Sequence, residues 1–385
     1  MERSYDVVLM GATGFTGGLT AAYLAEHMPA DGSWALAGRD LDRLGALRDR
    51  LGVDVPLLRA DVTDPDSLRD LASSARVVMT TVGPYLHYGE PLVAACAEAG
   101  TDYVDLTGES EFVDLMYLKY HERALETGAR IVHACGFDSI PHDLGVYFTV
   151  QHLPAGLPTH VRGYLRVNAT FSGGTYHSAI NALSRGRETK DAHRRRRQAE
   201  PSLRDRRVRS VTGRPHRNAG LGVWALPLPT IDPEIIRRSA TALDAYGPDF
   251  SYSHFVTMKR LPAAAGLVAG AAGLMTATHI PPVREWLLGR VKPGDGPSAE
   301  KRAKSWFSVH FIGEAGDHKV VTKVSGGDPG YDETAKMLAE SAMSLAYDDL
   351  PKTAGQVTTT EAMGDALLER LQRAGIAFTV VGSRE

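Results

Sequence analysis

The chain has 385 residues, of which 43% are hydrophobic and 23% charged, and its formal net charge is −3. The length exceeds that of one ordinary core, so we expect two domains. The composition excludes wholesale disorder, and the small net charge excludes a protein that binds polyanions over its whole surface.

Only two cysteines occur, Cys96 and Cys135, and neither belongs to a Cys-x-x-Cys or Cys/His ligand pattern. We therefore expect no disulfide framework and no metal site. The N-terminus passes directly into an apolar run without a signal peptide, which predicts a cytoplasmic protein.

A glycine-rich turn separates an apolar run at Asp6–Met10 from a helical pattern. Its sequence is Gly11-Ala12-Thr13-Gly14-Phe15-Thr16-Gly17. A strand, a glycine turn and a helix in this order are typical of a dinucleotide-binding Rossmann fingerprint, here spaced G-x-x-G-x-x-G. Gly11 would permit the tight turn, Gly14 would let the pyrophosphate approach the backbone, and Gly17 would let the helix pack closely. The pyrophosphate would lie at the helix N-terminus, where N–H groups favour anions.

The second predicted strand, Trp34–Gly38, is followed by Arg39 and Asp40. An arginine at this position accommodates the 2′-phosphate of NADP, whereas an acid binds the 2′-hydroxyl of NAD. We favour NADP(H), with Asp40 capping the helix that starts near Leu41. The alternative is that Arg39 is a solvated surface residue and that Asp40 binds the ribose.

Two further strands carry predicted cofactor contacts at their carboxyl ends. The strand Val55–Leu58 leads to Asp61 and Val62, which would flank the adenine. The strand Val77–Thr81 leads to a loop that should approach the nicotinamide ribose. That loop is Val82-Gly83-Pro84-Tyr85.

Alternation of helices and strands continues to His133. The predicted elements are a helix at Glu90–Ala99, a strand at Tyr103–Leu106, a helix at Phe112–Glu126 and a strand at Ala129–His133. This alternation predicts an α/β fold with a doubly wound parallel sheet.

Several short motifs recur in one order along the chain. Besides the glycine turn and Ala37-Gly38-Arg39, they are Val82–Tyr85, Tyr88–Pro91, Tyr103–Glu109, Gly136–Pro141, Ser172–Thr175 and Gly327–Tyr331. In these motifs the sequence resembles the saccharopine dehydrogenase-like oxidoreductases, and within them the trans-acting enoyl reductases of polyketide and lipid assembly.

The resemblance implies three parts and the use of NADP(H). Residues 1–150 would form the Rossmann domain, residues 155–328 a second α/β (α+β) substrate domain, and residues 329–385 C-terminal helices that pack back on the first domain. It does not fix the substrate, because a shared fold can serve different chemistry.

The second half begins with a linker at Pro154–Pro158 and a predicted strand at Val161–Val167. A turn at Ser172–Thr175 then precedes a helix from about Tyr176. This turn would either hold a substrate carbonyl with backbone N–H groups and the Thr175 hydroxyl, or serve as a structural turn.

Residues 185–217 carry thirteen Lys/Arg and four Asp/Glu. Such a run is usually a solvated face. The alternative is a docking surface for an acidic partner, such as an acyl carrier protein, a coenzyme A phosphate or an anionic membrane. No motif supports nucleic-acid binding.

The stretch Leu261–Val283 contains no Asp, Glu, Lys or Arg, but it is rich in alanine and glycine and interrupted by prolines. A membrane-spanning helix is therefore disfavoured. We expect a buried helix or one wall of an acyl pocket, with peripheral membrane contact as a third option.

The remaining segments predict strands at Trp306–Ile312 and Lys319–Lys323, helices at Tyr331–Tyr347 and Glu361–Ala374, and a strand at Phe378–Val381. The sheet of the second domain would contact substrate or a second copy in a homodimer.

Three hypotheses follow for function. The first is NADPH-dependent reduction of an enoyl substrate of polyketide, fatty acyl or isoprenoid type, which needs a hydrogen-bond donor for the enolate oxygen and a proton for the α-carbon. Candidate donors are Tyr85, His87, Tyr176 and His177. The second is oxidation or reduction of an amino acid or imine, which would require converging arginines or lysines. The third is a non-catalytic NADP-binding scaffold at a lipid surface or carrier.

Overall fold

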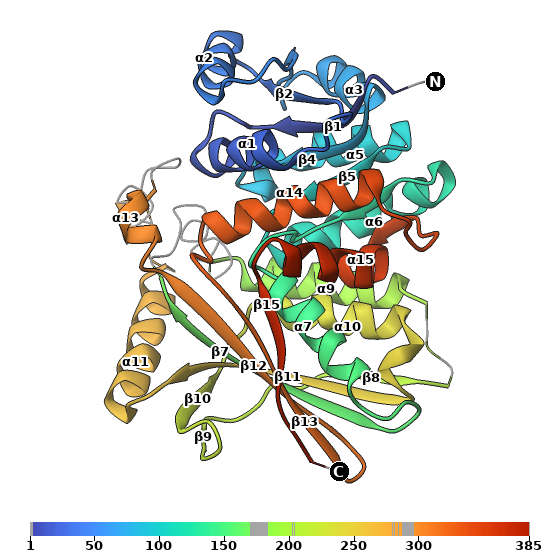
Figure 1. Ribbon diagram of the computed structural model, residues 1–385. Coiled ribbons are helices and arrows are strands. Elements are labelled where there is room, and N and C mark those ends of the chain that lie inside the picture. The colour runs from blue at the N-terminus through green and yellow to red at the C-terminus, as the bar shows by residue number, and fades with distance from the viewer. Residues whose placement is uncertain are drawn as a thin grey trace.

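A computed structural model describes residues 3–169, 184–201, 203, 205–278, 280, 282–283, 285–286 and 296–384. Within these residues the chain forms two sheets, one at each end of an elongated body (Figure 1). The predicted motifs Ser172–Thr175 and Tyr176-His177 lie outside the described residues.

The first sheet has seven parallel strands in the order β14-β6-β5-β4-β1-β2-β3. They are β1 (Tyr5–Met10), β2 (Trp34–Gly38), β3 (Leu57–Arg59), β4 (Ala75–Thr80), β5 (Asp102–Asp105), β6 (Arg130–Val132) and β14 (Gly355–Val357). Val7, Val8 and Leu9 are fully buried, as expected of a parallel sheet covered on both faces. The predicted doubly wound sheet is confirmed, and its order reverses between β1 and β4, where such sheets bind ligands.

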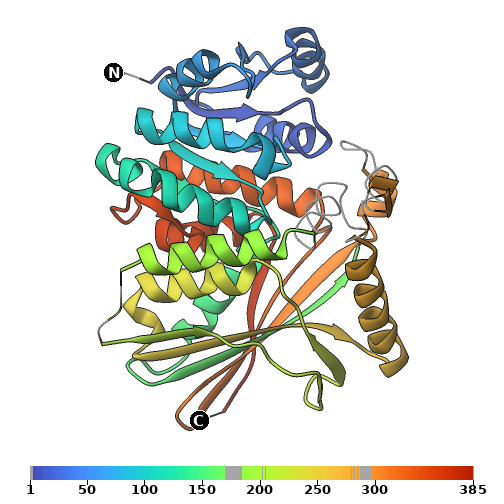
Figure 2. The ribbon, with the colours of Figure 1, turned by 180° about the vertical axis from the view of Figure 1, so that it is seen from behind.

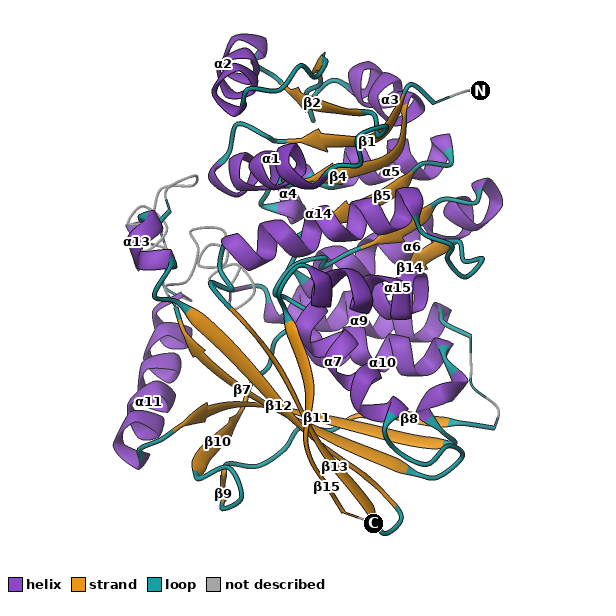
Figure 3. Ribbon diagram, in the orientation of Figure 1, coloured by secondary structure: helices purple, strands orange, loops and turns teal. Residues whose placement is uncertain are grey.

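Helices cover this sheet from both sides (Figure 3). They are α1 (Phe15–His27), α2 (Leu41–Leu51), α3 (Pro65–Ser74), the short α4 (Tyr85–Tyr88), α5 (Glu90–Ala99) and α6 (Ser110–Thr127). Local sequence sets where two of them begin. Asp40 accepts a hydrogen bond from the Arg43 N–H (3.0 Å), and Asp64 caps α3 in the same way, with Pro65 at its first position.

The second sheet is mixed and has eight strands. Seven run in the order β15-β13-β12-β7-β11-β10-β9, and β8 pairs with β11. They are β7 (Thr159–Asn168), β8 (Arg207–Ser210), β9 (His216–Asn218), β10 (Val223–Pro227), β11 (Asp249–Met258), β12 (Trp306–Ala315), β13 (His318–Gly326) and β15 (Ala377–Arg384).

Helices line one face of the second sheet and join it to the first. They are α7 (Ile140–Gln151), α9 (Gly186–Ala199), α10 (Asp232–Ala242) and the 3₁₀ turn η1 (Asp244–Tyr246). Helices α7 and α10 pack on the sheet, whereas α9 packs against α6 of the first part (Figure 2).

The C-terminal segment contributes to both sheets. Helix α14 (Asp332–Tyr347) lies on β4 and β5 and against α1, and α15 (Thr359–Arg373) packs on α14 and α7. Besides these helices, β14 extends the first sheet beside β6, and β15 extends the second sheet beside β13.

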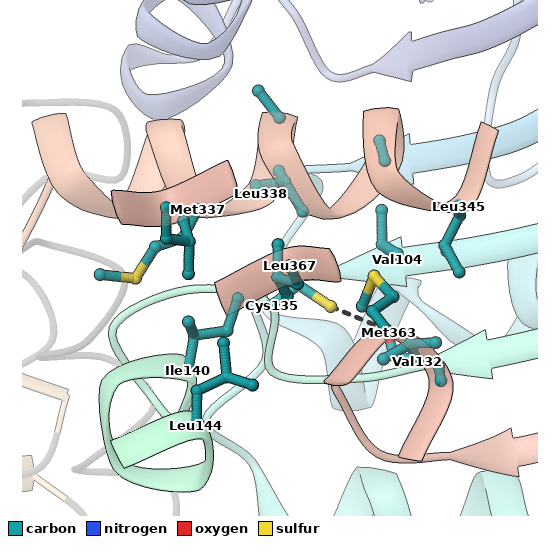
Figure 4. Packing of buried hydrophobic residues seen from close by; sticks show 14 of the residues in the cluster. Val104, Val132, Cys135, Ile140, Leu144, Met337, Leu338, Leu345, Met363 and Leu367 are labelled. Atoms are coloured by element: carbon teal, nitrogen blue, oxygen red, sulfur yellow. Dashed lines mark hydrogen bonds between the residues drawn. The ribbon is translucent and has the colours of Figure 1, made fainter. Parts of the chain in front are cut away.

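A continuous hydrophobic core therefore runs between the two sheets. Figure 4 shows side chains of α14 and α15 meeting those of the strand ends and of α7. The α14 residues Met337, Leu338 and Leu345 are buried in this core, so the apolar side of this helix serves packing.

Helix α11 (Leu261–Thr278) departs from the expectation for the uncharged stretch. The options for this stretch are a buried helix, one wall of an acyl pocket or peripheral membrane contact, and the buried helix is wrong for residues 261–270, where only Ala264 is buried. It stands off the side of the second sheet next to the short helix α13 (Ala299–Arg302), as Figures 1 and 2 show. Within the described residues, the structure has no helix with the length and apolarity needed to cross a membrane.

Candidate active site

The glycine turn between β1 and α1 is held by close backbone contacts. Gly11 has a φ of +89°, a conformation that side-chain-bearing residues rarely adopt. A Cβ atom on Gly17 would lie 2.1 Å from the Gly11 carbonyl oxygen, so only glycine fits there. The predicted roles of these two glycines in turn and packing agree with this geometry.

The start of α1 is suited to an anion. Gly14 is the N-cap residue and provides no side-chain hydrogen bond to the helix, so this end has no capping oxygen of its own. Thr13 and Gly14 are exposed, and Phe15 and Thr16 are half-buried. Backbone N–H groups at such a helix start bind phosphate, so the turn fits the pyrophosphate of a dinucleotide.

A segment from the second half of the chain packs against this turn. The Phe15 ring lies 4.8 Å from that of Tyr331, and the Arg302 guanidinium lies 5.5 Å from the Phe15 ring centre. Arg302 is held by hydrogen bonds to Asp332 (2.8 Å) and to the Pro297 carbonyl (2.9 Å). Sequence reasoning missed this arginine, which places a positive charge next to the glycine turn.

At the adenosine end, Arg39 is exposed directly after β2, while Asp40 caps α2. The carboxylate that would bind the ribose in the NAD alternative is therefore engaged with the helix. Hydrogen bonds from the Thr63 N–H and hydroxyl lower the pKa of Asp61, and the charges of Arg39 and Arg59 lower it further. Arg59 pairs with Gly38 across β2 and β3, so two guanidinium groups flank this end of the sheet. Sequence reasoning missed Arg59.

Tyr85 does not occupy the position expected of a proton donor. Its side chain is 6% exposed, and its hydroxyl donates to the Thr80 carbonyl (3.0 Å) and accepts from the Leu106 N–H (3.1 Å). Burial raises the pKa of this hydroxyl well above its usual value. Tyr85 thus ties β4 to the end of β5, and the expectation that it protonates substrate is corrected.

The rest of this loop lies at the carboxyl end of β4. Gly83 is exposed and Val82 and Pro84 are half-buried, while His87 is exposed on α4. Glu109 fixes α4 by accepting hydrogen bonds from the N–H groups of Tyr85 (3.1 Å) and Leu86 (2.9 Å). Among the predicted donors within the described residues, only His87 keeps an exposed side chain.

A carboxylate that sequence reasoning did not assign lies at the same edge of the sheet. Asp138 follows β6 and is half-buried, and a Cβ on Gly108, beyond the end of β5, would lie 3.2 Å from its Oδ2 atom. The ring of the preceding Phe137 packs 5.0 Å from that of Phe307 on β12. Asp138 therefore lies where the carboxyl edge of the first sheet meets the second sheet.

Behind Asp138 lies a buried acid–base group. The His142 Nδ1 atom is 2.9 Å from Asp232, and the other Asp232 oxygen is 3.7 Å from His254 Nε2. Tyr252 contacts the remaining His254 nitrogen at 2.8 Å. We call Asp138, His142, Asp232 and His254 the Asp138 cluster; its members come from the β6–α7 loop, α7, α10 and β11.

Electrostatics differ among the members of the cluster. Burial, followed by the negative charge of Asp232, raises the pKa of Asp138 to about 6. Burial acts to raise the pKa of Asp232, but the His142 ring outweighs it and the pKa is lowered. Burial acts to lower the pKa of His142, but the negative charge of Asp232 outweighs burial and the pKa is raised. For His254, burial and the positive charge of His142 both act in the same direction and lower the pKa to about 3. The arrangement stabilises a protonated His142 paired with an ionised Asp232, and it increases the fraction of Asp138 that is protonated at a given pH.

The basic run divides into buried and exposed arginines. Arg196 is 3% exposed; it bonds to Glu200 (2.8 Å) and Gln356 (2.6 Å), and lies 3.5 Å from Asp114. Arg206 donates to three backbone carbonyls around η1. The interpretation of the whole run as one solvated or docking face is therefore wrong for these two residues. Exposed cations remain on α9, namely Arg187, Lys190, Arg194, Arg195 and Arg197.

Within the described residues, no group of three or more His, Cys, Asp or Glu side chains could hold a metal ion. Cys96 and Cys135 are both free and buried.

Comparisons with known proteins agree with this geometry. Residues 7–132 match the saccharopine dehydrogenase NADP binding domain. A Mycobacterium tuberculosis H37Rv protein, provisionally named a trans-acting enoyl reductase, is 41% identical over 409 residues, covering 98% of this chain and 97% of that protein. The trans-acting enoyl reductase of Mycobacterium ulcerans is 37% identical and covers 98% of both chains.

Among solved structures, the chain is similar to apo saccharopine dehydrogenase (L-Glu forming) from Saccharomyces cerevisiae. The TM-score is 0.60 at 13% identity, covering 98% of this chain and all of that one. This likeness concerns the fold alone, whereas the full-length relatives establish the family. The chain belongs to the saccharopine dehydrogenase-like oxidoreductases, in the branch of the trans-acting enoyl reductases, and is an NADP-dependent oxidoreductase.

Proposed function

We propose that the protein reduces the carbon–carbon double bond of an enoyl substrate, with NADPH as hydride donor and Asp138 as proton donor. The observation that carries this proposal is a half-buried carboxyl group with a raised pKa at the edge of a dinucleotide-binding sheet. The names of the full-length relatives support the same reaction.

The residues present fit NADP(H). Gly11, Thr13, Gly14, Phe15, Thr16 and Gly17 would hold the pyrophosphate; Arg39, Asp61 and Val62 the adenosine end; and Val82, Gly83, Pro84 and the Tyr85 backbone the nicotinamide ribose. Arg59 adds a second guanidinium for the 2′-phosphate, a ligand that arginine binds well. When bound, NADPH supplies a hydride to the substrate β-carbon.

Asp138 completes the reduction. Gain of a hydride at the β-carbon leaves an enolate, whose α-carbon must take up a proton. The protonated Asp138 carboxyl gives that proton and becomes a carboxylate, which solvent reprotonates before the next turnover. A pKa of about 6 suits this role, because a general acid works best when its pKa is near the operating pH.

His142 and Asp232 tune the pKa of Asp138 through their charges and do not touch the substrate. The charge of Asp232 opposes ionisation of Asp138, while that of His142 favours it. His142 and Asp232 are both about 1% exposed. The fold therefore fixes the opposing effects of their two charges on Asp138 and shields them from solvent. The exposed His87 on α4 is a second candidate to donate a hydrogen bond to the enolate oxygen.

The charges around Asp138 disfavour an amino-diacid substrate. Among the described residues, the charged groups that act on the Asp138 pKa are Asp232 and His142, and neither is an arginine or lysine. Recognition of a substrate with two carboxylates requires such cations, typically as bidentate pairs. The apolar pair Phe137 and Phe307 suits an acyl chain better.

We further propose that an acidic acyl carrier protein docks on the exposed cations of α9. This helix packs on α6, beside the first sheet. The charge-reversed pair Arg187→Glu and Arg195→Glu should raise KM for a carrier-bound substrate, and leave KM unchanged for the same acyl group on N-acetylcysteamine. Equal effects on both substrates would argue against docking at α9.

The reaction is tested by following NADPH oxidation with enoyl thioesters of increasing chain length and with a polyprenyl lipid. We expect saturation of the double bond, seen by mass spectrometry as a gain of two hydrogens. Oxidation of an amino acid with NADP⁺, in place of enoyl reduction, would favour the imine or amino-acid hypothesis. NADPH binding without turnover of either class would favour the non-catalytic scaffold.

A further inference from the structure

Helix α11 is apolar on every side, yet little of the protein covers it. Its 18 residues contain no charged side chain. Residues 265–270 are all exposed, and six consecutive residues of an α-helix point in every direction around its axis. Helices that are apolar all round are normally buried in a protein core or in lipid.

Large apolar side chains on and after α11 are among the most exposed of the molecule. Val268 is 52% exposed and Leu267 39%, and beyond the helix Ile280 is 49% and Trp286 56% exposed. Where a Cβ is imagined on Gly266 or Gly270, it meets no atom of the protein within 4 Å. The exposed surface is therefore continuous over residues 265–270.

Cationic residues stand at the start of this apolar surface. Lys259 and Arg260 are both exposed and directly precede α11. Cations beside an apolar segment match a surface that is anionic outside and apolar inside, which describes a bilayer with acidic headgroups. Exposed tryptophan is likewise typical of the membrane–water interface.

We propose that α11 inserts into the headgroup–acyl boundary of an anionic lipid bilayer and holds the protein at the membrane surface. A protein partner would cover one side of the helix, whereas lipid surrounds it on all sides not facing the second sheet. Helix α11 lies in this boundary and does not cross the bilayer, since no described helix has the length and apolarity to do so.

The position of α11 places the membrane near the candidate active site. The helix contacts β10 and β11 of the second sheet and stands on the same side of the molecule as α13, whose Arg302 packs over Phe15 of the glycine turn (Figure 1). A lipid substrate would therefore approach from the side of the molecule on which α13 and the glycine turn meet. The membrane contact itself does not depend on which reaction the protein catalyses.

Flotation with vesicles tests the proposal on the full-length protein. We expect it to float with vesicles made of equal parts phosphatidylglycerol and phosphatidylcholine. The double variant Leu267→Asp, Val268→Asp should reduce binding at least about tenfold, because charges are costly in the acyl region. Leu125→Asp, at a site 45% exposed on α6, is the matched control and should float like the unaltered protein.

The cationic flank and the depth of insertion are tested separately. Lys259→Glu with Arg260→Glu should weaken binding to the mixed vesicles by about fivefold per charge, and not to pure phosphatidylcholine. Brominated lipids should quench the fluorescence of Trp286, and Trp286→Phe should remove that quenching. Absence of flotation by the unaltered protein would overturn the proposal. The proposal would also be overturned if the protein forms a stable dimer in solution and the Leu267→Asp, Val268→Asp variant is monomeric. That result would mean that α11 binds a second copy of the chain.

Discussion

The glycine turn and the Asp138 cluster lie at the same edge of the first sheet, but different atoms build them. In the turn, the decisive contacts join backbone atoms a few residues apart, such as Gly17 and the Gly11 carbonyl. In the cluster, ionisable side chains of α7, α10 and β11 meet in a buried setting, next to Asp138 of the β6–α7 loop. The first region binds by a fixed backbone shape, whereas the second works through charges whose pKa values depend on the whole fold.

If this contrast is correct, changes in the two regions should affect different steps. Variants of the cluster should lower kcat and leave NADPH affinity unchanged. Variants of the cofactor end should weaken NADPH binding.

The largest effect is expected for Asp138→Asn, which keeps the shape of the side chain but cannot give up a proton. Loss of a general acid should lower kcat by about 100- to 10,000-fold. The dissociation constant for NADPH, measured by calorimetry, should stay unchanged. An Asn variant with kcat close to the unaltered protein would remove Asp138 from the mechanism.

Gly17→Ala should act on binding. The Cβ of the new alanine would meet the Gly11 carbonyl oxygen, so the turn must shift. Overpacking of this kind costs about 3 kcal/mol, and a loss of that size in binding free energy corresponds to roughly a hundredfold weaker NADPH binding. Gly18→Ala is the matched control in the same helix, because its Cβ would lie at an ordinary 3.7 Å from the Ala12 oxygen. Equal affinities for the two variants would show that the turn does not hold the cofactor.

Arg39→Ala should separate NADPH from NADH. Losing one charged hydrogen bond of about 1.5 kcal/mol weakens NADPH binding about tenfold, with no change for NADH, which lacks the 2′-phosphate. Arg43→Ala, on the neighbouring helix α2, serves as the control. An equal loss of affinity for NADPH and NADH would contradict the assignment of Arg39 to the 2′-phosphate. The double variant Arg39→Ala, Arg59→Ala should weaken NADPH binding more than Arg39→Ala alone.

The pH dependence of kcat gives the mildest test. Asp138 must be protonated to act, so kcat should be constant below its pKa of about 6 and fall about tenfold per pH unit above it. The Asp138→Asn variant should lose this dependence. A profile with no change near pH 6 would mean that another group supplies the proton.

The sequence alone was sufficient for the features that depend on near neighbours. Three features follow from residues only a few positions apart: the glycine turn, the caps at Asp40 and Asp64, and the alternation of strands and helices. In each of them the local backbone geometry restricts which residue types fit at a position. They predicted the doubly wound sheet and the use of NADP(H).

Only the tertiary structure decided which side chains are buried and what they meet. Contacts between segments far apart in the chain determine the inward position of Tyr85, the burial of Arg196 within a basic run and the exposure of α11. They also bring His142, Asp232 and His254 together and place the charges of His142 and Asp232 where they act on Asp138. Burial sets the cost of a charge and therefore its pKa, and no local pattern of residues contains that information.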